Sequence, residues 1–417
     1  MRYFLLFISV VFLLSACSDD SGTETKRYQC TVIVYMSAEN DLQYYIYDNL
    51  ADMKAGSKSV SGNNRFVVFV DNASAVTKPY IAEINDGRCD TIMHFENEFY
   101  SSDPEKFAEV IDIIEKKYPS EKYGLVLWGH ATGWLVCKDT IAQSSNKMAR
   151  PRKAYGVDSG VNQAGSKGYR WMNITQMAKA LQKFPRFKFI LADCCCMMCV
   201  ETCYELRHVT DYLIGSPAEI PGEGAPYSQL IKYLFSKSDD FYREIVDCYY
   251  DHYLEEFRKP EWTNDDAYSY LENHSVPLAV VDMNYMEELA QATRDVLQSP
   301  YTHQFDSVPY YFYYDYPVMY DMSCLLEKNC VPEDYAIWRK TLEKAVPYRR
   351  FSACWETIYR PIMWQMEHNG FHYNEKNYGG ISMFVPQAKY DASPDFLYNN
   401  GIKNFAWYKA VGWDRFE

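Results

Sequence analysis

The chain has 417 residues, of which 48% are hydrophobic, so it is long enough to bury one large core or two closely joined cores. Its 42 basic and 56 acidic residues give a formal net charge of -14, which argues against nucleic acid as a partner and suits cationic substrates. Thirteen cysteines fit no small disulfide-rich scaffold in a chain of this length, and we expect most of them to be reduced and buried.

The amino terminus has the pattern of an export signal rather than of a folded element. A positive start precedes an apolar stretch, residues 3–14, that is too short to span a membrane. Leu14-Ser15-Ala16-Cys17 then resembles the processing site of a bacterial lipoprotein. We therefore expect a signal peptide over residues 1–16, lipid on Cys17, and a tether over residues 17–28.

Ser18-Asp19-Asp20 follows the predicted lipidated cysteine. It resembles the acidic tag that directs lipoproteins to the cell surface in Bacteroides-like bacteria, and it also has the composition of an ordinary polar tether. The resemblance predicts an outer-membrane lipoprotein that is exposed at the surface and contacts the membrane through its lipid anchor only.

After the tether, strand and helix patterns alternate, which predicts an α/β fold with a mainly parallel sheet. Apolar runs predict strands over residues 31–35, 65–70, 123–128, 187–192, 212–215, 278–281 and 381–385. Helices are predicted over residues 104–117, 173–183, 200–206 and 239–257.

The carboxyl-terminal part differs in pattern from the rest. Residues 300–370 are rich in tyrosine and show mixed helical periodicity. Because a core-like strand is predicted again near residue 381, we expect residues 301–417 to pack on the sheet of a domain formed by residues 29–300.

Two predicted strands end in reactive side chains. One ends in Trp128-Gly129-His130 and another in Asp193-Cys194-Cys195-Cys196. Ligands of open α/β sheets gather outside the carboxyl ends of the strands, so we expect the imidazole and a thiol to meet there. A free thiol, with a pKa of about 8.5, is mostly protonated at neutral pH, and a nearby imidazole can act as the base that generates the attacking thiolate. The pattern predicts a cysteine nucleophile and its histidine base.

These motifs resemble those of the clostripain family of cysteine peptidases, in the caspase-like clan. Residues 128–134, WGHATGW, are similar to the family's W-G/D-H-G-x-G-W, with Ala131 in place of a glycine. The family's D-A-C-L-M-A-x-x-E aligns with residues 193–201 and makes Cys195 the nucleophile. Residues 32–40, 216–224 and 380–386 resemble further family segments in the same order.

The resemblance implies a caspase-like α/β/α sandwich with a helical carboxyl-terminal elaboration, and an endopeptidase that works through a covalent acyl-enzyme. His130 then moves the proton, and the backbone N–H groups of Ala131 and Cys195 serve as the oxyanion hole. Alanine can fill this role unless the loop needs a conformation that only glycine adopts.

The resemblance also implies cleavage after Arg or Lys. Asp193 occupies the position of an acidic residue in the family's S1 pocket, and Glu223 the acidic position of its P-G-D-G loop. Carboxylates can pair with a guanidinium or ammonium group. For Asp193, a structural cap of the following helix is the alternative.

Residues 138–153 form a polar stretch between the two catalytic residues, with little apolar periodicity. Related enzymes are activated by cleavage in the corresponding segment, so we expect self-cleavage at Lys147, Arg152 or Lys153, with Lys147 favoured. Arg150 is a poor candidate because Pro151 restricts the bond to be cut. The alternative is a basic surface loop that is not processed.

Three further interpretations remain open. The cysteines of residues 194–203 could bind a soft metal, but no second thiol pair accompanies them, so we predict no metal and no required cofactor; calcium is left open without an evident motif. A catalytically silent surface lipoprotein could bind protein or glycan. A cysteine amidase or transpeptidase would use the same chemistry on another substrate.

Overall fold

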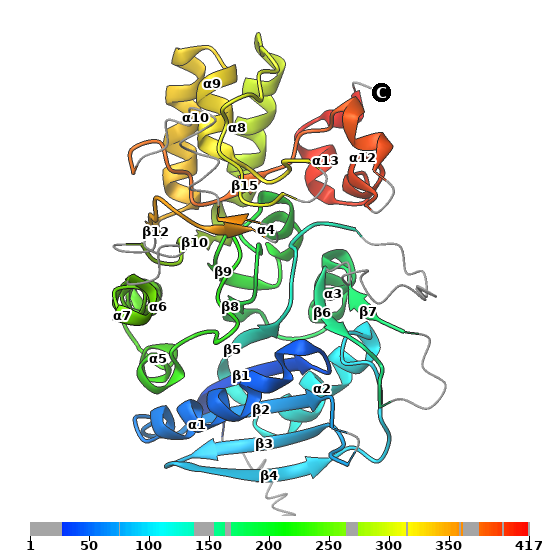
Figure 1. Cartoon of the computed structure of the whole chain (residues 1–417), viewed down its shortest axis with the longest axis vertical. Helices are drawn as coiled ribbons and strands as arrows, with labels where there is room; N and C mark the ends of the chain where they lie inside the picture. The colour runs from blue at the N-terminus through cyan, green and yellow to red at the C-terminus, as the bar shows by residue number, and fades with distance from the viewer. Residues whose placement is uncertain are drawn as a thin grey trace, which may run out of the picture.

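A nine-stranded sheet with the order β12-β10-β9-β8-β5-β1-β2-β3-β4 runs through the molecule (Figure 1). Its strands are β1 (Tyr28–Ala38), β2 (Asn64–Asn72), β3 (Tyr80–Asn85), β4 (Arg88–His94), β5 (Ser120–Gly129), β8 (Phe187–Asp193), β9 (Thr210–Gly215), β10 (Leu278–Asp282) and β12 (Tyr348–Arg350). The central strands β2, β1, β5, β8 and β9 are parallel, and antiparallel pairs extend both edges. The predicted α/β fold around a parallel sheet is confirmed.

The structure is a computed structural model that describes residues 27–74, 76–136, 154–162, 168–263, 274–313, 316–357, 360–361, 375–393 and 396–415. The predicted signal peptide, Cys17, and the self-cleavage candidates Lys147, Arg152 and Lys153 lie outside these residues. No helix in the described part of the chain combines the length and the apolar character needed to cross a lipid bilayer.

Both faces of the central strands are buried, which explains why they appear in the sequence as continuous apolar runs. In β1, Ile33 and Tyr35 belong to one core, whereas Val32 and Val34 belong to the core on the opposite face. The strand period of two divides every central strand between the two cores in this way.

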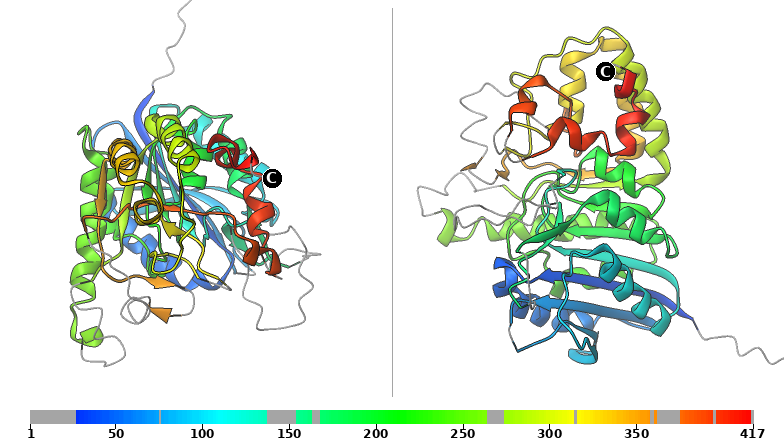
Figure 2. Two further views of the ribbon diagram at one scale, coloured as in Figure 1. Left: turned by 90° about the horizontal axis from the view of Figure 1, so that it is seen from above. Right: turned by 90° about the vertical axis from the view of Figure 1, so that its right-hand side faces the viewer.

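Helices cover both faces (Figures 1 and 2). The core that contains Val32 also includes residues of α1 (Ile46–Ser57), α5 (Tyr227–Leu234) and α6 (Phe241–Glu256). The core that contains Ile33 includes residues of α2 (Pro104–Lys117), α3 (Ile174–Leu181), α4 (Val200–Leu206) and α8 (Met286–Gln298). The result is a three-layered α/β/α arrangement.

The predicted helices over residues 104–117, 173–183, 200–206 and 239–257 are confirmed within one to two residues at most ends. The sequence patterns missed α1, α8 and the β3–β4 hairpin. In α1 the buried side includes Asn49, Gly56 and Ser57, so its apolar periodicity is weak. In β4 no residue is fully buried, so it carries little strand signal.

The carboxyl-terminal region adds helices beyond the β12 end of the sheet (Figure 1), and Figure 2 shows the same region from two other sides. Its main helices are α9 (Met322–Asn329), α10 (Pro332–Ala345), α12 (Tyr398–Ile402) and α13 (Ala406–Ala410). The remaining short elements are η1 (Asp41–Tyr45), β6 (Tyr155–Asp158), β7 (Arg170–Met172), α7 (Pro260–Thr263), η3 (Met283–Tyr285), β11 (Tyr320–Asp321), β13 (Glu356–Thr357), β14 (Arg360–Pro361), β15 (Ser382–Met383), η4 (Ala388–Ala392) and η5 (Trp413–Arg415). Strand β12 joins this region to the main sheet.

The prediction of a core strand over residues 381–385 is wrong. The strand there, β15, has two residues and pairs with β11 in a separate two-stranded sheet. This segment instead binds the turn after β8 and the start of α4: Ser382 N donates to Met198 O at 2.9 Å, and Phe384 N donates to Glu201 Oε1 at 2.7 Å. The segment is apolar because it is buried against α4, not because it lies in the sheet.

Candidate active site

The register of β5 and β8 brings the two predicted catalytic residues to the same edge of the sheet. The strands are parallel neighbours, and Trp128 lies level with Asp193. His130 and Cys195 each follow two residues later. Because neighbouring strands lie about 4.8 Å apart, side chains at these equivalent positions leave the sheet next to each other.

Of the three consecutive cysteines, Cys195 alone is partly exposed, whereas Cys194 and Cys196 are buried. Burial raises the pKa of the Cys194 and Cys196 thiols well above the usual value. A buried neutral thiol is a poor nucleophile, because the thiolate is the reactive form. The environment therefore favours Cys195 for chemistry.

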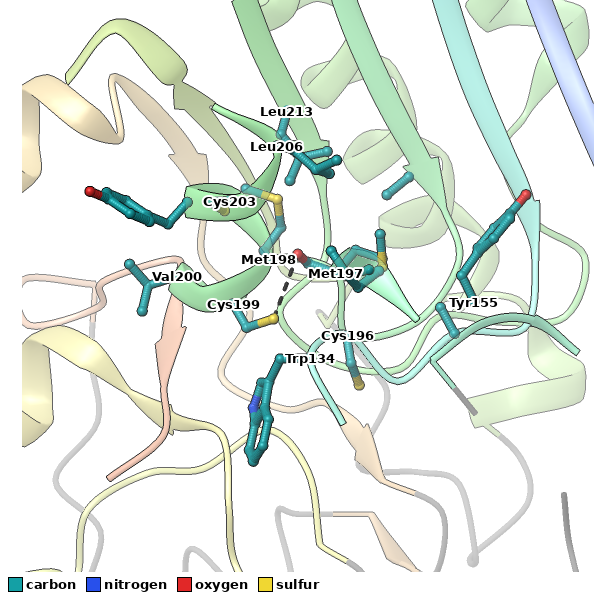
Figure 3. Packing of buried hydrophobic residues seen from close by; sticks show 14 of the residues in the cluster. Trp134, Tyr155, Cys196, Met197, Met198, Cys199, Val200, Cys203, Leu206 and Leu213 are labelled. Atoms are coloured by element: carbon teal, nitrogen blue, oxygen red, sulfur yellow. Dashed lines mark hydrogen bonds between the residues drawn. The ribbon is translucent and has the colours of Figure 1, made fainter. Parts of the chain in front are cut away.

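A sharp turn directly after Cys195 exposes its side chain. Cys196 has a φ of 58°, a left-handed conformation that is uncommon outside glycine. Its N–H donates to Ala218 O at 2.9 Å, which holds the turn in place. Met197, Met198 and Cys199 then pack into the core beside Trp134 (Figure 3).

The Cys195 sulfur contacts the loop that follows β9. The Ile220 N–H lies 3.4 Å from Cys195 Sγ, and Ile220 O lies 3.9 Å from it. In the first contact the Ile220 N–H donates to the sulfur, and in the second the thiol donates to the Ile220 carbonyl, so this loop fixes the position of the side chain. Ile220 acts through its backbone, so no side-chain pattern in the sequence could identify it.

His130 has a carboxylate partner that the sequence patterns did not identify. Its Nε2 lies 2.6 Å from Asp41 Oδ1; the His130 side chain is 16% exposed and that of Asp41 79%. Asn40 fixes the backbone before Asp41, because its side chain donates to Ser37 O and Val157 O and accepts from Leu42 N. Asp41 follows β1, and β1 is the other strand that pairs with β5. A carboxylate just after the end of this strand is the sequence signal that could have revealed Asp41.

The loop after His130 packs tightly against the turn after Cys195. Gly133 has a φ of +58°, and a Cβ atom there would lie 2.4 Å from Cys196 O and 2.8 Å from Cys199 Sγ. A side chain at residue 133 would therefore push the two loops apart. This glycine fixes the distance between the histidine loop and the cysteine loop.

Ala131, which replaces a glycine of the family motif, needs no glycine conformation. It is not among the residues with positive φ. It forms an antiparallel bridge with Tyr155. The hydrogen bonds of this bridge are made by the residues on either side of the pair: Gly156 N donates to His130 O, and Thr132 N donates to Ala154 O. The Ala131 N–H therefore points away from Tyr155 and makes no hydrogen bond within this bridge.

Asp193 lies in a buried hydrogen-bond network. Its carboxylate accepts from Tyr227 Oη at 2.7 Å, Tyr249 Oη at 2.8 Å and Ala225 N at 3.1 Å, and the residue is 3% exposed. Burial raises its pKa, and the three donors act in the opposite direction. The alternative that Asp193 caps the following helix is wrong: Cys199 is the N-cap of α4, and Asp193 binds the start of α5 instead.

Glu223 lies on the same loop, with an exposed side chain. Gly224, which follows it, packs directly against Asp193: a Cβ atom on Gly224 would lie 2.9 Å from Asp193 Oδ2. The loop is held by Tyr253 Oη, which donates to Gly224 O at 2.7 Å, and by Asn49 Nδ2, which donates to Glu223 O at 3.0 Å. Glu223 thus lies on this loop, whereas Asp193, the last residue of β8, lies against Gly224 of the same loop.

The chain is similar to known proteins in sequence and in fold. A family model described as the clostripain family, Peptidase C11, matches residues 34–340. Clostripain from Hathewaya histolytica is 23% identical over 235 residues, which cover 50% of this chain and 43% of that protein, so the match spans less than half of its length.

Two solved structures are similar over almost the whole chain. One is a secreted C11 cysteine protease from Bacteroides thetaiotaomicron in complex with an irreversible peptide inhibitor, with a TM-score of 0.74, 25% identity, and 93% of this chain and 99% of that one covered. The other is an inactive zymogen of a C11 protease from Parabacteroides distasonis, with a TM-score of 0.70, 25% identity and the same coverage. Together with the family match over residues 34–340, these findings show that the chain belongs to the clostripain family of cysteine peptidases.

Proposed function

We propose that this protein is a cysteine endopeptidase in which Cys195 is the nucleophile and His130 the general base. One observation carries the proposal: β5 and β8 are adjacent and parallel, and the two residues follow them at equivalent positions. In addition, Cys195 is partly exposed, whereas Cys194 and Cys196 are buried. The thiolate attacks the scissile carbonyl carbon while His130 holds the thiol proton. His130 then protonates the leaving amine, and water hydrolyses the thioester, which returns the thiol.

The oxyanion of the tetrahedral intermediate is stabilised by the backbone N–H groups of Ala131 and Cys195. The direction of the Ala131 N–H, away from the Tyr155 bridge, supports this assignment. Donors that are fixed before the reaction stabilise the developing charge without reorganisation.

Asp41 acts as a positioning residue for His130. In the tautomer that donates from Nε2 to Asp41, the Nδ1 lone pair is left to accept the thiol proton. The carboxylate then also stabilises the imidazolium that forms. A surface carboxylate of this kind has a modest effect, because solvent screens it.

Cleavage follows Arg or Lys. Glu223, exposed on the loop, is the direct partner of the substrate cation, and Asp193 supplies a buried negative charge beneath Gly224. The tyrosine donors keep that charge stable in a poorly solvated place. The protein is a surface lipoprotein anchored through Cys17; of this, the secreted relative supports export only. Cleavage between His130 and Cys195 converts the protein from a zymogen, and the inactive zymogen relative supports this point.

Replacing Cys195 or His130 by Ala is expected to abolish turnover of peptides with a reporter amide after Lys or Arg, because each removes an essential part of the proton and acyl transfer. Cys194→Ala is the matched control and should keep most of the activity, since Cys194 is buried. Mass spectrometry of protein treated with a thiol-reactive peptide inhibitor should place the label on Cys195. A label on Cys194 would contradict the assignment.

Asp41→Asn is expected to lower kcat by about 5- to 50-fold with little change in KM, because the ring loses its charged partner but keeps a neighbour of the same shape. The acidic limb of the pH profile of kcat/KM should shift to lower pH, since the imidazolium loses a stabilising charge. Asp48→Asn, on the nearby helix α1, is the control. An unchanged profile would remove Asp41 from the machinery.

Asp193→Asn is expected to lower kcat/KM for Lys and Arg peptides by at least about tenfold, mainly through KM, and to affect a Leu peptide less. Asparagine is preferred to alanine because it leaves an acceptor for Tyr227 and Tyr249. Tyr227→Phe removes a donor but keeps the charge, so it should retain the basic preference. If Asp193→Asn retains that preference too, the charge has no part in specificity.

Self-processing is tested by expressing the chain without residues 1–16 beside its Cys195→Ala variant. Wild type should give two fragments, and the variant one intact chain. Lys147→Ala should slow the cut or move it to Arg152 or Lys153. A wild-type chain that stays intact and is fully active would exclude cleavage as an activation step.

A further inference from the structure

A tyrosine side chain, Tyr45, packs against the loop that carries Glu223. Tyr45 is the last residue of η1, the element that begins with Asp41, and its side chain is partly exposed. A Cβ atom on Gly222 would lie 2.8 Å from Tyr45 Cε2 and 3.1 Å from Tyr45 Oη. The phenol end of the ring therefore lies directly on the residue before Glu223. Tyr45 has no part in the proton and acyl transfer assigned to His130 and Cys195.

The loop makes a tight turn at this point. Gly224 N donates to Pro221 O at 3.1 Å, which makes Gly222 and Glu223 the two corner residues of the turn. Gly222 is not among the glycines with positive φ, so its backbone conformation does not require a glycine. The tyrosine ring requires it, because the ring occupies the space that a side chain at residue 222 would need. The ring and the exposed Glu223 side chain therefore belong to one corner of the loop.

The electrostatic environment of Tyr45 agrees with this placement. The negative charge of Glu223 is the main cause that raises the pKa of Tyr45, and burial and the charge of Asp41 act in the same direction. A nearby carboxylate raises the pKa of a phenol because it repels the phenolate. Tyr45 thus lies near two carboxylates, the one proposed to bind the substrate cation and the one that contacts His130.

A buried amide, that of Asn49, fixes the ring-bearing segment to the carboxylate-bearing segment. Asn49 Nδ2 donates to Tyr45 O at 2.9 Å and to Glu223 O at 3.0 Å. Its Oδ1 accepts from Trp128 Nε1 at 3.2 Å, and Trp128 lies level with Asp193 in the sheet. Asn49 is 4% exposed, so these bonds are shielded from solvent. The ring and the carboxylate are therefore held together before a substrate binds, which lowers the cost of binding.

We propose that Tyr45 makes the enzyme prefer Arg to Lys before the cleaved bond, an inference that rests on the proposed cleavage after basic residues. A guanidinium is planar and weakly hydrated, so it can lie against an aromatic ring while its N–H groups bind a carboxylate. An ammonium is compact and strongly hydrated, so it gains less from the ring. The corner is close to the attacked carbonyl, because Ile220 of the same loop contacts Cys195 and lies three residues, at most about 10 Å, from Glu223.

The test uses the chain from residue 18 onward and two peptides that differ only in having Arg or Lys before a reporter amide. The ratio of their kcat/KM values does not depend on the fraction of active enzyme, so differences in self-cleavage between variants do not affect it. We expect the wild type to favour the Arg peptide by about three- to tenfold, and Tyr45→Leu to bring the two values close together. Tyr45→Phe keeps the ring and should keep most of the preference.

Gly222→Ala is the second variant, should Tyr45→Leu fail to fold: its Cβ displaces the ring and leaves Glu223 in place, so the ratio should fall again. Tyr47→Leu, at a residue of α1 that is 79% exposed, is the matched control and should keep the wild-type ratio. A wild type that cleaves both peptides equally well, or a ratio that neither variant changes, would overturn this inference and leave the proposed function intact. No cleavage after either Arg or Lys would overturn the proposed function, and this inference with it.

Discussion

The pairing of β5 with β8 is the constraint on which the rest of the site depends. Trp128 lies level with Asp193 in the parallel register, and the reactive residues come at the same offset after each strand. A shift of one residue would turn the side chains of one strand to the opposite face and exchange the members of the two cores. Burial on both faces therefore fixes the register, and the register fixes the relation between His130 and Cys195.

Buried carboxylates fix irregular segments that form no strand hydrogen bonds with the sheet. Asp193 accepts from Ala225 N, Glu201 from Phe384 N, and Asp321 from Cys324 N and Gly379 N. Ala225, Phe384 and Gly379, each distant in sequence from its partner, are thereby tied to the frame by a buried hydrogen bond. Burial raises the pKa of all three groups, that of Glu201 to about 8. The loops around the site are thus positioned by polar contacts with strict geometry rather than by apolar packing alone.

Much of the frame could be predicted because its signals are local. The apolar runs of β1, β5 and β8 and the capping residues Asp103 and Asn173 are visible in a few adjacent residues, and the structure has strands and helices there. The contacts that complete the site are not local. Asp41 reaches His130 across 89 positions of sequence, and the residues after β15 reach Glu201 across 183. No pattern within one segment carries that information, so the sequence indicated His130 and Cys195 as candidates but not the distant residues that contact them.

The topology also decides what a cut between the catalytic residues would do to the fold. The interval in question is residues 137–153, which lie outside the described part of the chain. Its two flanks are close together, because Ala154 O accepts a hydrogen bond from Thr132 N at 2.9 Å. Strands β1, β2 and β5 precede this interval, whereas β8 and β9 follow it, yet β5 and β8 are neighbours in one sheet. Two products would therefore remain joined by the full length of the β5–β8 ladder and by both cores. Because His130 lies on one side of the interval and Cys195 on the other, the same ladder that brings them together would keep them together after the cut.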